Sequence, residues 1–359
     1  MLLETGLSMI MNHESLIATK ARRVRTVAPK DALMEFGLRR AQGHSAGLWG
    51  ARAAMIGGFN GTSNVEAGKQ FGIPVLGTMA HSWVMSFDEE IDAFREYVRQ
   101  YHDNLILLAD TYNVLEMGVP HAIQVFKELK EEGRLPGKYG IRIDSGDIAY
   151  LSQEATRMFT EAGFPDVIIS GSNDLDEYTI QSLKAQGCTV TSWGVGTKII
   201  TADGTSALGG VFKMAVKEAD GKEVPVMKFS NDVEKMTNPG IKTVYRFYKK
   251  DTGKMITDLV CLHDEKAADG GDFTLVTESA KWRRKELKAG TYTVEELLRP
   301  VVENGRNLPL PALFEIIRYA DKHMDTLWPE YTRLLNPDLM EINLSDKLQT
   351  LKSELIRRE

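Results

Sequence analysis

The sequence predicts an α/β fold built around a parallel β-sheet, with a smaller β-rich portion and a helical region after it. Short apolar runs alternate with helical segments of about 8 to 15 residues, at least five times before residue 198. Some runs, such as Leu105–Ala109, are apolar throughout, as burial of both sheet faces requires. The sheet could be open or closed, and the spacing and number of the units favour an irregular (β/α) barrel.

The expected elements of this sheet follow from apolar periodicity and from turn residues. The first helix, for example, has apolar residues at helical spacing and no Gly or Pro from Leu7 until Pro29. Helices are expected over 7–28, 46–55, 63–70, 87–101, 118–132, 148–162 and 175–186. Strands are expected over 33–38, 56–59, 74–77, 105–109, 139–143, 167–169 and 188–193. The strand over 74–77 ends abruptly and presents His81 just beyond its end.

The pattern changes from about Val211. Two β-hairpins are expected, with turns at Asp220-Gly221 and Asp251-Thr252-Gly253, and their strands would form an appended antiparallel sheet. Residues 290–359 read as mostly helical, with helices over 295–298, 311–320 and 344–356. We therefore expect three parts: an α/β barrel catalytic domain over 1–210, a β-hairpin sandwich portion over 211–265, and a mainly helical C-terminal region over 266–359.

The composition is that of a soluble globular protein with no general attraction to nucleic acid. The 359 residues are 43% hydrophobic and 26% charged, and the net charge is −6. Cys188 and Cys261 lie far apart without metal-type spacing, which fits a reducing cytoplasm and argues against disulfides or structural zinc. No apolar run approaches the roughly 20 residues of a membrane span, and no signal peptide is evident. We expect a cytoplasmic protein with no nucleic-acid or membrane partner.

Polar residues follow every expected strand. Because the carboxyl ends of parallel strands lie on one side of a sheet, these residues should converge at one mouth. One or two of the sets would be explained as turns and caps, and His81 taken alone could simply cap the next turn. So large a group favours a site: Arg39-Arg40, Asn60-Gly61-Thr62, Thr78 with His81, Asp110-Thr111-Tyr112, Arg142 with Asp144, Ser170-Gly171-Ser172, and Gly194, Gly196 and Thr197.

Two of these sets indicate phosphate binding. Ser170-Gly171-Ser172 and Gly194-Val195-Gly196-Thr197 place backbone N–H groups and hydroxyls where strands lead into helices, which is a natural anion site. The cations at the end of the first helix complement its dipole, but they are more numerous than the dipole needs. Several phosphates on one substrate are therefore expected to meet a group of arginines: Arg22, Arg23, Arg39 and Arg40.

Arg142 and Asp144 lie two residues apart on one expected strand, so their side chains should point to the same face. Asp144 could hold sugar hydroxyls, and Arg142 could hold a carboxylate through two hydrogen bonds. The alternative is an internal ion pair between the two side chains.

A specific set of motifs runs through the first three quarters of the chain: Glu35–Gly43, Gly77–Ser82, Ile141–Asp147, Gly194–Thr197, and Lys228-Phe229-Ser230 with Lys235–Gly240. Together these motifs resemble the nicotinate phosphoribosyltransferase family, and the resemblance covers most of residues 1–262. It implies the fold of type II phosphoribosyltransferases, an irregular α/β barrel beside an open-faced β-sandwich.

The resemblance also implies a reaction. Nicotinate and phosphoribosyl pyrophosphate would give nicotinate mononucleotide and pyrophosphate, the first step of NAD salvage from nicotinate. ATP hydrolysis would be coupled to this step through a phosphorylated histidine, at the position of His81. Magnesium would accompany the pyrophosphate, and the protein would be a homodimer.

The resemblance assigns further roles by position. Thr78 and Arg142 match residues that contact nicotinate, and Thr197 matches one that contacts the phosphoribosyl group. We expect Asp144 to join His81 as a catalytic residue. No metal ligands are assigned. The other candidates for binding the phosphoribosyl and phosphate groups are Arg22, Arg39, Arg40, Ser170, Gly171, Ser172, Gly194 and Gly196.

Family members begin upstream of the segment equivalent to Leu2, with strands and helices that include an aromatic residue stacking on nicotinate. The chain is therefore expected to lack an N-terminal domain and half of the sandwich, so that the hairpins at 211–262 expose edges and apolar faces. We expect poor solubility or oligomerisation as a result. Three alternatives remain open: a nicotinamide phosphoribosyltransferase, a quinolinate phosphoribosyltransferase, and an inactive truncated remnant that only binds ligand.

Overall fold

The computed structural model describes residues 2–101, 103, 105–231, 235–267, 271–277 and 284–358. Contacts between residues divide the chain into two compact units. The barrel unit is Met9–Leu208, and the second unit combines Met1–Ser8 with Gly209–Glu359. Each unit has its own sheet, and each is described by itself.

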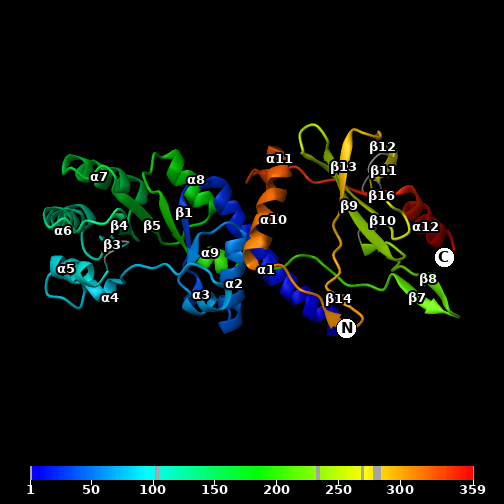
Figure 1. Cartoon of the computed structure of the whole chain (residues 1–359), viewed down its shortest axis with the longest axis horizontal. Helices are drawn as coiled ribbons and strands as arrows, with labels where there is room; N and C mark the ends of the chain where they lie inside the picture. Colours follow the sequence, from blue (N-terminus) through cyan, green and yellow to red (C-terminus); the bar gives the residue numbers. More distant parts are fainter. Residues whose placement is uncertain are drawn as a thin grey trace. The chain divides into compact units, whose positions relative to one another are not determined.

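A curled parallel sheet forms the centre of the barrel unit (Figure 1). Its strands lie in the order β2-β1-β6-β5-β4-β3, and each neighbouring pair is parallel. This order follows the chain around a barrel that is open between β2 and β3, so the expected irregular α/β barrel is confirmed in the form of a half-barrel. The strands are β1 Ala32–Glu35, β2 Gly61–Thr62, β3 Leu105–Leu108, β4 Tyr139–Ile143, β5 Ile168–Ser172 and β6 Ser192–Val195.

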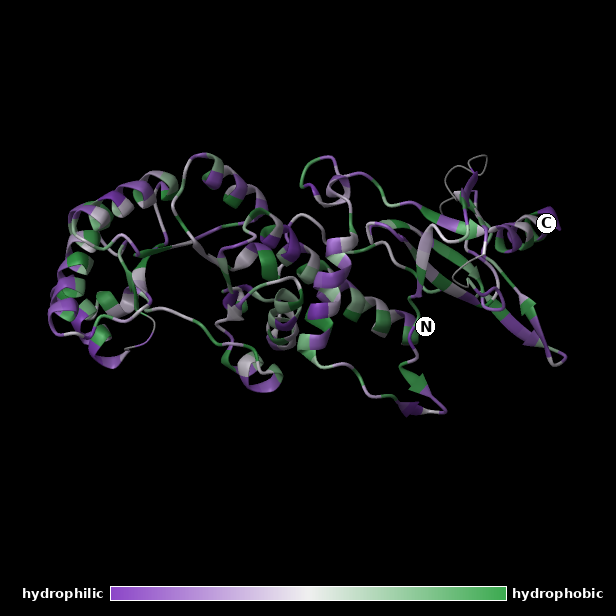
Figure 2. Ribbon diagram, turned by 45° about the horizontal axis from the view of Figure 1, so that its top comes forward, coloured by the Kyte–Doolittle hydropathy of each residue, from purple (hydrophilic) through white to green (hydrophobic). Residues whose placement is uncertain are grey.

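Helices pack around this sheet through their apolar side chains, and several of them have one apolar face. In α6 the buried residues recur at helical spacing, at Val119, Ala122, Val125, Phe126 and Leu129. Figure 2 shows the resulting bands of hydrophobic and hydrophilic residues along the helices. The helices are α1 Leu2–Val27, α2 His44–Ile56, α3 Val65–Phe71, α4 His81–Val84, α5 Glu90–Gln100, α6 Val119–Glu131, α7 Ile148–Glu161, α8 Glu177–Ala185 and α9 Thr197–Ile200, with short turns η1 Leu38–Arg40 and η2 Val114–Gly118.

Two of the expected strands are wrong. Residues 56–59 are the end of α2 and the turn after it, because α2 continues to Ile56. The strand expected over 74–77 is reduced to a single parallel bridge between Val75 and Thr62. Its partner β2 is only two residues long, so the pairing cannot extend. Beyond the bridge, the segment continues without regular structure to His81.

The last two strands of the half-barrel are shifted from their expected positions. β5 extends through Ser172, so the set Ser170–Ser172 belongs to a strand and not to a turn. β6 begins at Ser192 and includes Gly194 and Val195, whereas the residues from Cys188 to Thr191 precede the strand. The glycines pair as ordinary strand residues here, because Ser172 lies opposite Gly194 in the parallel register.

A second sheet, in the order β12-β11-β16-β10-β9-β13, curls on itself in the second unit. Phe273 of β11 and Tyr292 of β13 come from strands near opposite edges, yet their ring centroids lie 6.2 Å apart, and both rings contact Phe247 of β9. These aromatic side chains form the centre of its core. The elements are β9 Lys242–Lys249, β10 Met255–Leu262, β11 Phe273–Thr277, β12 Arg284–Leu287, β13 Tyr292–Glu296, β16 Ile342–Ser345, α10 Leu313–Thr326, α11 Pro329–Thr332 and α12 Asp346–Arg357.

The hairpin turns expected in this unit are confirmed. Asp220 and Gly221 both have positive φ and join β7 Val216–Ala219 to β8 Lys222–Pro225, as a two-residue hairpin requires. The expected appended sheet is wrong in one respect, because β7 and β8 form a separate sheet from β9 and β10. A third hairpin joins β14 Val302–Glu303 to β15 Arg306–Asn307.

The helix expected over 295–298 is wrong. These residues overlap β13, which pairs with β9 along five residue pairs. Residues 266–358 therefore contribute strands as well as the helices α10, α11 and α12, so they are not a separate helical region. Among the described residues, no helix is both long and apolar enough to span a lipid bilayer.

Gly140 of β4 lies so close to β5 that a side chain has no room. A Cβ at this position would lie 2.0 Å from the carbonyl oxygen of Ile168, which is fixed by strand pairing. We expect Gly140→Ala to lower the free energy of unfolding by about 1–3 kcal/mol. Gly137, three residues earlier, has nothing within 4 Å of such a Cβ, so Gly137→Ala is the matched control. Urea denaturation of both variants measures the difference, and equal stabilities would speak against this packing.

Candidate active site

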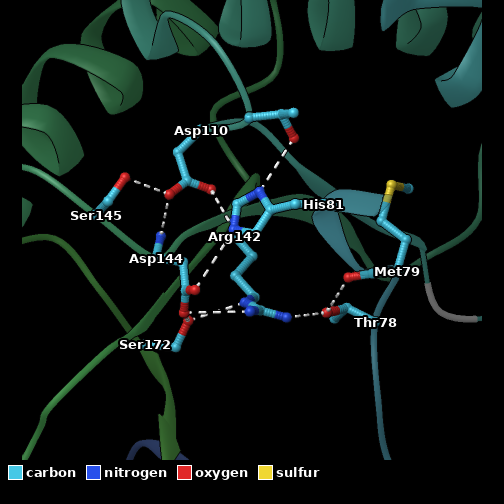
Figure 3. Close-up of polar contacts among 9 residues, drawn as sticks. Thr78, Met79, His81, Asp110, Arg142, Asp144, Ser145 and Ser172 are labelled. Carbon is cyan, nitrogen blue, oxygen red and sulfur yellow. Dashed lines mark hydrogen bonds and ion pairs between the residues drawn. The ribbon is translucent and has the colours of Figure 1, made fainter. Parts of the chain in front are cut away.

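Polar side chains from three neighbouring strands meet at the carboxyl edge of the half-barrel (Figure 3). Asp110 follows β3, Arg142 belongs to β4 and is followed by Asp144, and β5 ends at Ser172. The segment Val75–His81 also reaches this edge. It pairs with β2 at Val75 and extends to the end of β3, where His81 begins α4. The convergence expected from the strand ends therefore brings these four parts of the chain together.

Arg142 is the centre of this cluster, and 15% of its side chain is exposed. Its Nε donates to Ser172 Oγ (2.8 Å), one terminal nitrogen donates to Thr78 Oγ1 (2.6 Å), and the other lies 3.1 Å from Asp144 Oδ1. Figure 3 shows the guanidinium between Thr78 on one side and Ser172 with Asp144 on the other. Among the described residues these contacts use three of its five N–H groups, so two remain for a ligand oxygen. The internal ion pair is present, but it does not exhaust the donors.

The pKa of Asp144 is lowered from its ordinary value. Burial acts to raise this pKa, but the hydrogen bond from Ser172, the charge and hydrogen bond of Arg142, and the contact with His81 outweigh it. The carboxyl group is therefore ionised at neutral pH. Its contribution to stability is complete above the unfolded-state pKa and is lost as the pH falls through the lowered pKa of the folded state.

Ser172→Ala is expected to raise the pKa of Asp144 towards its ordinary value, because the variant loses the hydrogen bond that most strongly lowers it. The loss of stability at acid pH should then be smaller and should be complete at a higher pH, whereas its onset, which the unfolded-state pKa sets, should not change. Ser170→Ala is the matched control, since the Ser170 hydroxyl contacts Ser192 (3.4 Å) and not Asp144. Titration of the aspartate carboxyl carbons by NMR measures the pKa, and an unchanged value in Ser172→Ala would refute this assignment.

His81 is the first residue of α4, and 39% of its side chain is exposed. Its Nδ1 lies 3.2 Å from Thr111 Oγ1, and its Nε2 lies 3.5 Å from Asp144 Oδ2 and 3.9 Å from Asp110 Oδ1. Figure 3 shows the imidazole beside Asp110 and Asp144. The ring is thus oriented by carboxylates and a hydroxyl while it stays accessible, as a general base or a nucleophile must be.

Asp110 is also part of this site. It belongs to one of the polar sets that follow the expected strands, but the sequence alone assigns it no role of its own. Its side chain is 1% exposed, and its Oδ2 accepts hydrogen bonds from Ser145 Oγ (2.6 Å) and from the backbone N–H of Asp144 (3.1 Å). Its Oδ1 faces His81 and accepts no hydrogen bond from the described residues. The signal in the sequence was an acidic residue placed directly after a wholly apolar run.

The serine set expected to bind phosphate lies in β5, and only one of its members reaches the cluster. Ser170 is buried beside Ser192, and Gly171 lies within the strand. The Ser172 hydroxyl accepts from Arg142 and donates to Asp144, so it already has two partners. Through Ser172, this set therefore mainly holds the Arg142 guanidinium and the Asp144 carboxylate in position.

The glycine set is packed against the end of β1. The ring of Phe36 lies directly against Gly194, and Gly196 precedes α9, of which Thr197 is the first residue. Phe36 is a second residue of this edge that the sequence did not single out. The available signal was a large aromatic side chain at the carboxyl end of a strand.

The four arginines do not form one cluster. Arg39 and Arg40 lie exposed in η1, directly after β1 and at the same edge of the sheet as the site. Arg22 in α1 donates to the last residue of α2 (3.3 Å), and Arg23 donates to Glu177 in α8 (2.7 Å). Arg39 and Arg40 are therefore accessible at the mouth, whereas Arg22 and Arg23 join α1 to its neighbours.

A cleft of about 730 Å³ borders the segment that carries the site. It is lined by Val75–Ala80 and by Trp83, Tyr97 and Tyr101, among others. The cluster beside it combines a fixed cation, an ionised carboxylate and an accessible imidazole, which can hold an anion and stabilise charge during group transfer. Among the residues that the structure describes, no group of three or more His, Cys, Asp or Glu could hold a metal ion.

Two family models match the sequence. The model described as the nicotinate phosphoribosyltransferase (NAPRTase) family matches residues 32–266. The model described as the nicotinate phosphoribosyltransferase C-terminal domain matches residues 241–352. Together they span residues 32–352 and so include most of each unit.

Similar proteins agree with these matches. Nicotinate phosphoribosyltransferase of Bacillus subtilis (strain 168) is 41% identical over 359 residues, which cover 99% of this chain and 71% of that protein. The crystal structure of human nicotinic acid phosphoribosyltransferase is 30% identical and has a TM-score of 0.82, covering 99% of this chain and 76% of the human chain. A nicotinate-nucleotide pyrophosphorylase from Pyrococcus furiosus shares the fold at 23% identity, with a TM-score of 0.68 over 90% of this chain and 73% of that one.

The motifs, the parallel half-barrel and the matched relatives point to one assignment. The first family model alone spans more than half of the chain, and the B. subtilis relative is matched over most of its own length. The chain therefore belongs to the nicotinate phosphoribosyltransferase family.

Proposed function

We propose that this chain joins nicotinate to phosphoribosyl pyrophosphate, forming nicotinate mononucleotide and pyrophosphate in NAD salvage. Relatives named nicotinate phosphoribosyltransferase support the assignment. The observation that carries it is the guanidinium of Arg142, which is fixed by Thr78, Ser172 and Asp144 and keeps two N–H groups for a carboxylate.

The reaction needs alignment more than it needs a strong base. Displacement at the anomeric carbon passes through a state with oxocarbenium character, so acceptor, ribose and leaving group must lie in line. Arg142 would hold the nicotinate carboxylate beside Thr78. The pyridine nitrogen then forms its bond to the anomeric carbon as the bond to pyrophosphate breaks. The ionised carboxylate of Asp144 would accept hydrogen bonds from the ribose hydroxyls.

The phosphate groups of the substrate would lie along the same edge of the sheet. Arg39 and Arg40 are exposed there, and the backbone of Gly196 and the hydroxyl of Thr197 stand at the turn after β6. These groups supply the positive charge and donors that a departing pyrophosphate requires. Magnesium would enter as part of the substrate, bound to its pyrophosphate.

ATP would act through His81. A ring nitrogen of His81 would attack the γ-phosphorus of ATP, ADP would leave, and water would later hydrolyse the phosphohistidine to phosphate. The support is the position of His81, which is accessible and oriented by Thr111, Asp144 and Asp110. A phosphoryl group adds nearly two negative charges beside two carboxylates, so phosphorylation would weaken the present packing of the ring and draw in cations.

The alternative substrates fit the site less well. Nicotinamide carries no charge and would leave the two remaining N–H groups of Arg142 without an anionic partner. Quinolinate carries two carboxylates and would call for a second cation, yet Arg142 is the cation held within the cluster among the described residues. Nicotinate, with one carboxylate, matches this arrangement.

We also propose a homodimer in a reducing compartment. Apolar side chains of the first helix are exposed, among them Leu3, Met9 and Met11, and a second subunit would bury such residues. The thiols of Cys188 and Cys261 are free, as they remain in a reducing compartment.

The test is direct formation of product. The purified chain is incubated with nicotinate, phosphoribosyl pyrophosphate and magnesium, with and without ATP, and nicotinate mononucleotide is measured by chromatography. Product that requires both substrates and increases with ATP is expected. Binding of phosphoribosyl pyrophosphate without any product would instead support the inactive remnant that the sequence left open.

A further inference from the structure

Glu35 is a buried acid at the end of β1 that no step of the proposed reaction uses. It is 0% exposed, and each carboxylate oxygen accepts one hydrogen bond: Oε1 from the backbone N–H of Gly37 and Oε2 from Thr62 Oγ1 (2.5 Å). Its backbone oxygen accepts from the N–H of Ser63 (3.0 Å). Glu35 therefore connects the turn after β1 with β2 and with the residue that follows β2.

The turn held in this way is η1, which carries Arg39 and Arg40. Gly37, the residue before η1, is wedged so tightly that a Cβ would lie 2.5 Å from Ile200 Cβ and 2.9 Å from the carbonyl oxygen of Gly196. The arginine turn thus packs directly against the turn that carries Gly196, and the Glu35 carboxylate belongs to the same contact, because its Oε1 lies 2.8 Å from the position of that Cβ.

Burial makes this carboxylate costly for stability. The pKa of Glu35 is raised, because burial outweighs the hydrogen bonds from Thr62 and Gly37. A raised pKa means that the ionised form lowers stability at neutral pH, progressively as the pH rises above the unfolded-state value. A residue kept for stability alone would be apolar or neutral here, so a positional role explains the acid better.

We infer that Glu35 is a positioning residue for the phosphate end of the substrate, acting through Gly37 on the turn that carries Arg39 and Arg40. The inference rests on the proposed function, in which these arginines meet the pyrophosphate. Removal of the carboxylate frees the Gly37 N–H and lets the arginine turn move relative to Gly196. Arg142 and Thr78 belong to other strands and loops, so nicotinate should be held as before.

The experiment measures binding and turnover separately. Isothermal titration calorimetry gives the affinity for the magnesium salt of phosphoribosyl pyrophosphate in the wild-type chain and in Glu35→Ala. We expect affinity to fall by about tenfold or more, since a misplacement of about 1 Å can cost up to about a hundredfold. In turnover, the KM for phosphoribosyl pyrophosphate should rise while the KM for nicotinate stays unchanged, a split that general loss of stability would not produce.

Two further variants separate position from stability. Glu35→Gln should bind almost as the wild type does, because its amide oxygen can accept from Gly37 and its amide nitrogen can donate to Thr62. Asp31→Ala removes a carboxylate that is 11% exposed at the opposite end of the same strand, where it holds Lys184 (2.6 Å) and Trp193 (2.7 Å). It should lower Tm without changing the affinity.

The outcomes are distinguishable. No binding of phosphoribosyl pyrophosphate by the wild-type chain would overturn both the proposed function and this inference. Binding and turnover by the wild type, with the same affinity in Glu35→Ala, would overturn the inference alone. If Glu35→Ala does not fold, Thr62→Val decides, because it removes one of the two partners of the carboxylate. Weaker binding then supports the inference, and unchanged binding overturns it.

Discussion

Arg142→Lys is expected to raise the KM for nicotinate by about thirtyfold or more while the chain stays folded. The guanidinium contacts Thr78 and Ser172 from one planar group and would hold the ligand carboxylate from the same group, which a lysine ammonium cannot do. Loss of one partner from a desolvated charge pair costs about 2–5 kcal/mol, which corresponds to roughly thirtyfold to several thousandfold in affinity.

Steady-state kinetics with nicotinate varied at saturating phosphoribosyl pyrophosphate measures this effect. Arg157→Lys is the matched control, because Arg157 is exposed on α7 and pairs only with Glu154 and Glu161 among the described residues. Its KM for nicotinate should equal that of the wild type. If Arg142→Lys also keeps the wild-type value, the guanidinium does not hold the carboxylate.

His81→Ala is expected to remove the ATP-dependent part of the rate completely. The variant lacks the imidazole that is proposed to accept the γ-phosphoryl, whereas Arg142, Thr78 and Asp144 would still hold the other substrates. Product formation without ATP should therefore persist near the wild-type level, because the site in its absence needs only alignment of the reactants.

Labelling with ATP that carries a radioactive γ-phosphate tests the same claim chemically. The wild-type chain should acquire an acid-labile, alkali-stable label, and His81→Ala should acquire none. His44→Ala is the control, since His44 is exposed on α2 and pairs with Glu66 (2.8 Å). Label that persists in His81→Ala, or ATP stimulation that survives in it, would remove His81 from the coupling step.

The sequence was sufficient to predict the parallel sheet and the edge at which the polar residues meet. Apolar runs such as Leu105–Ala109 mark strands buried on both faces, and their order along the chain requires parallel pairing. That pattern places the residues after each strand on one side. Arg142, Asp144 and Thr78 accordingly lie in contact, although 64 residues separate Thr78 from Arg142.

Local patterns were less informative where tertiary contacts decide the structure. The run at 74–77 is apolar enough for a strand, but β2 offers only two residues to pair with it. Arg22 and Arg23 resemble a phosphate-binding group in the sequence, and only the fold shows that they contact α2 and α8. The importance of Asp110 likewise depends on the neighbours of a single buried oxygen.

The second unit was harder to predict because its sheet is formed by distant segments. Strand β16 pairs in parallel with β10, about eighty residues earlier in the chain, and antiparallel with β11. Neither turn residues nor hydrophobic periodicity predict a pairing between segments so far apart in the sequence. The hairpin turns at Asp220-Gly221 and between β9 and β10 were predictable, because positive φ or a short connection restricts the residue choice locally.

The most direct test of the role proposed for Arg142 is a competition between nicotinate, which carries a carboxylate, and nicotinamide, which carries an amide. The wild-type chain is offered equal concentrations of nicotinate and nicotinamide with limiting phosphoribosyl pyrophosphate, ATP and magnesium, and the two mononucleotides are separated and quantified. If Arg142 selects its substrate through the carboxylate, nicotinate mononucleotide should be nearly the whole product. Equal amounts of both products, or an excess of nicotinamide mononucleotide, would contradict the central role assigned to Arg142.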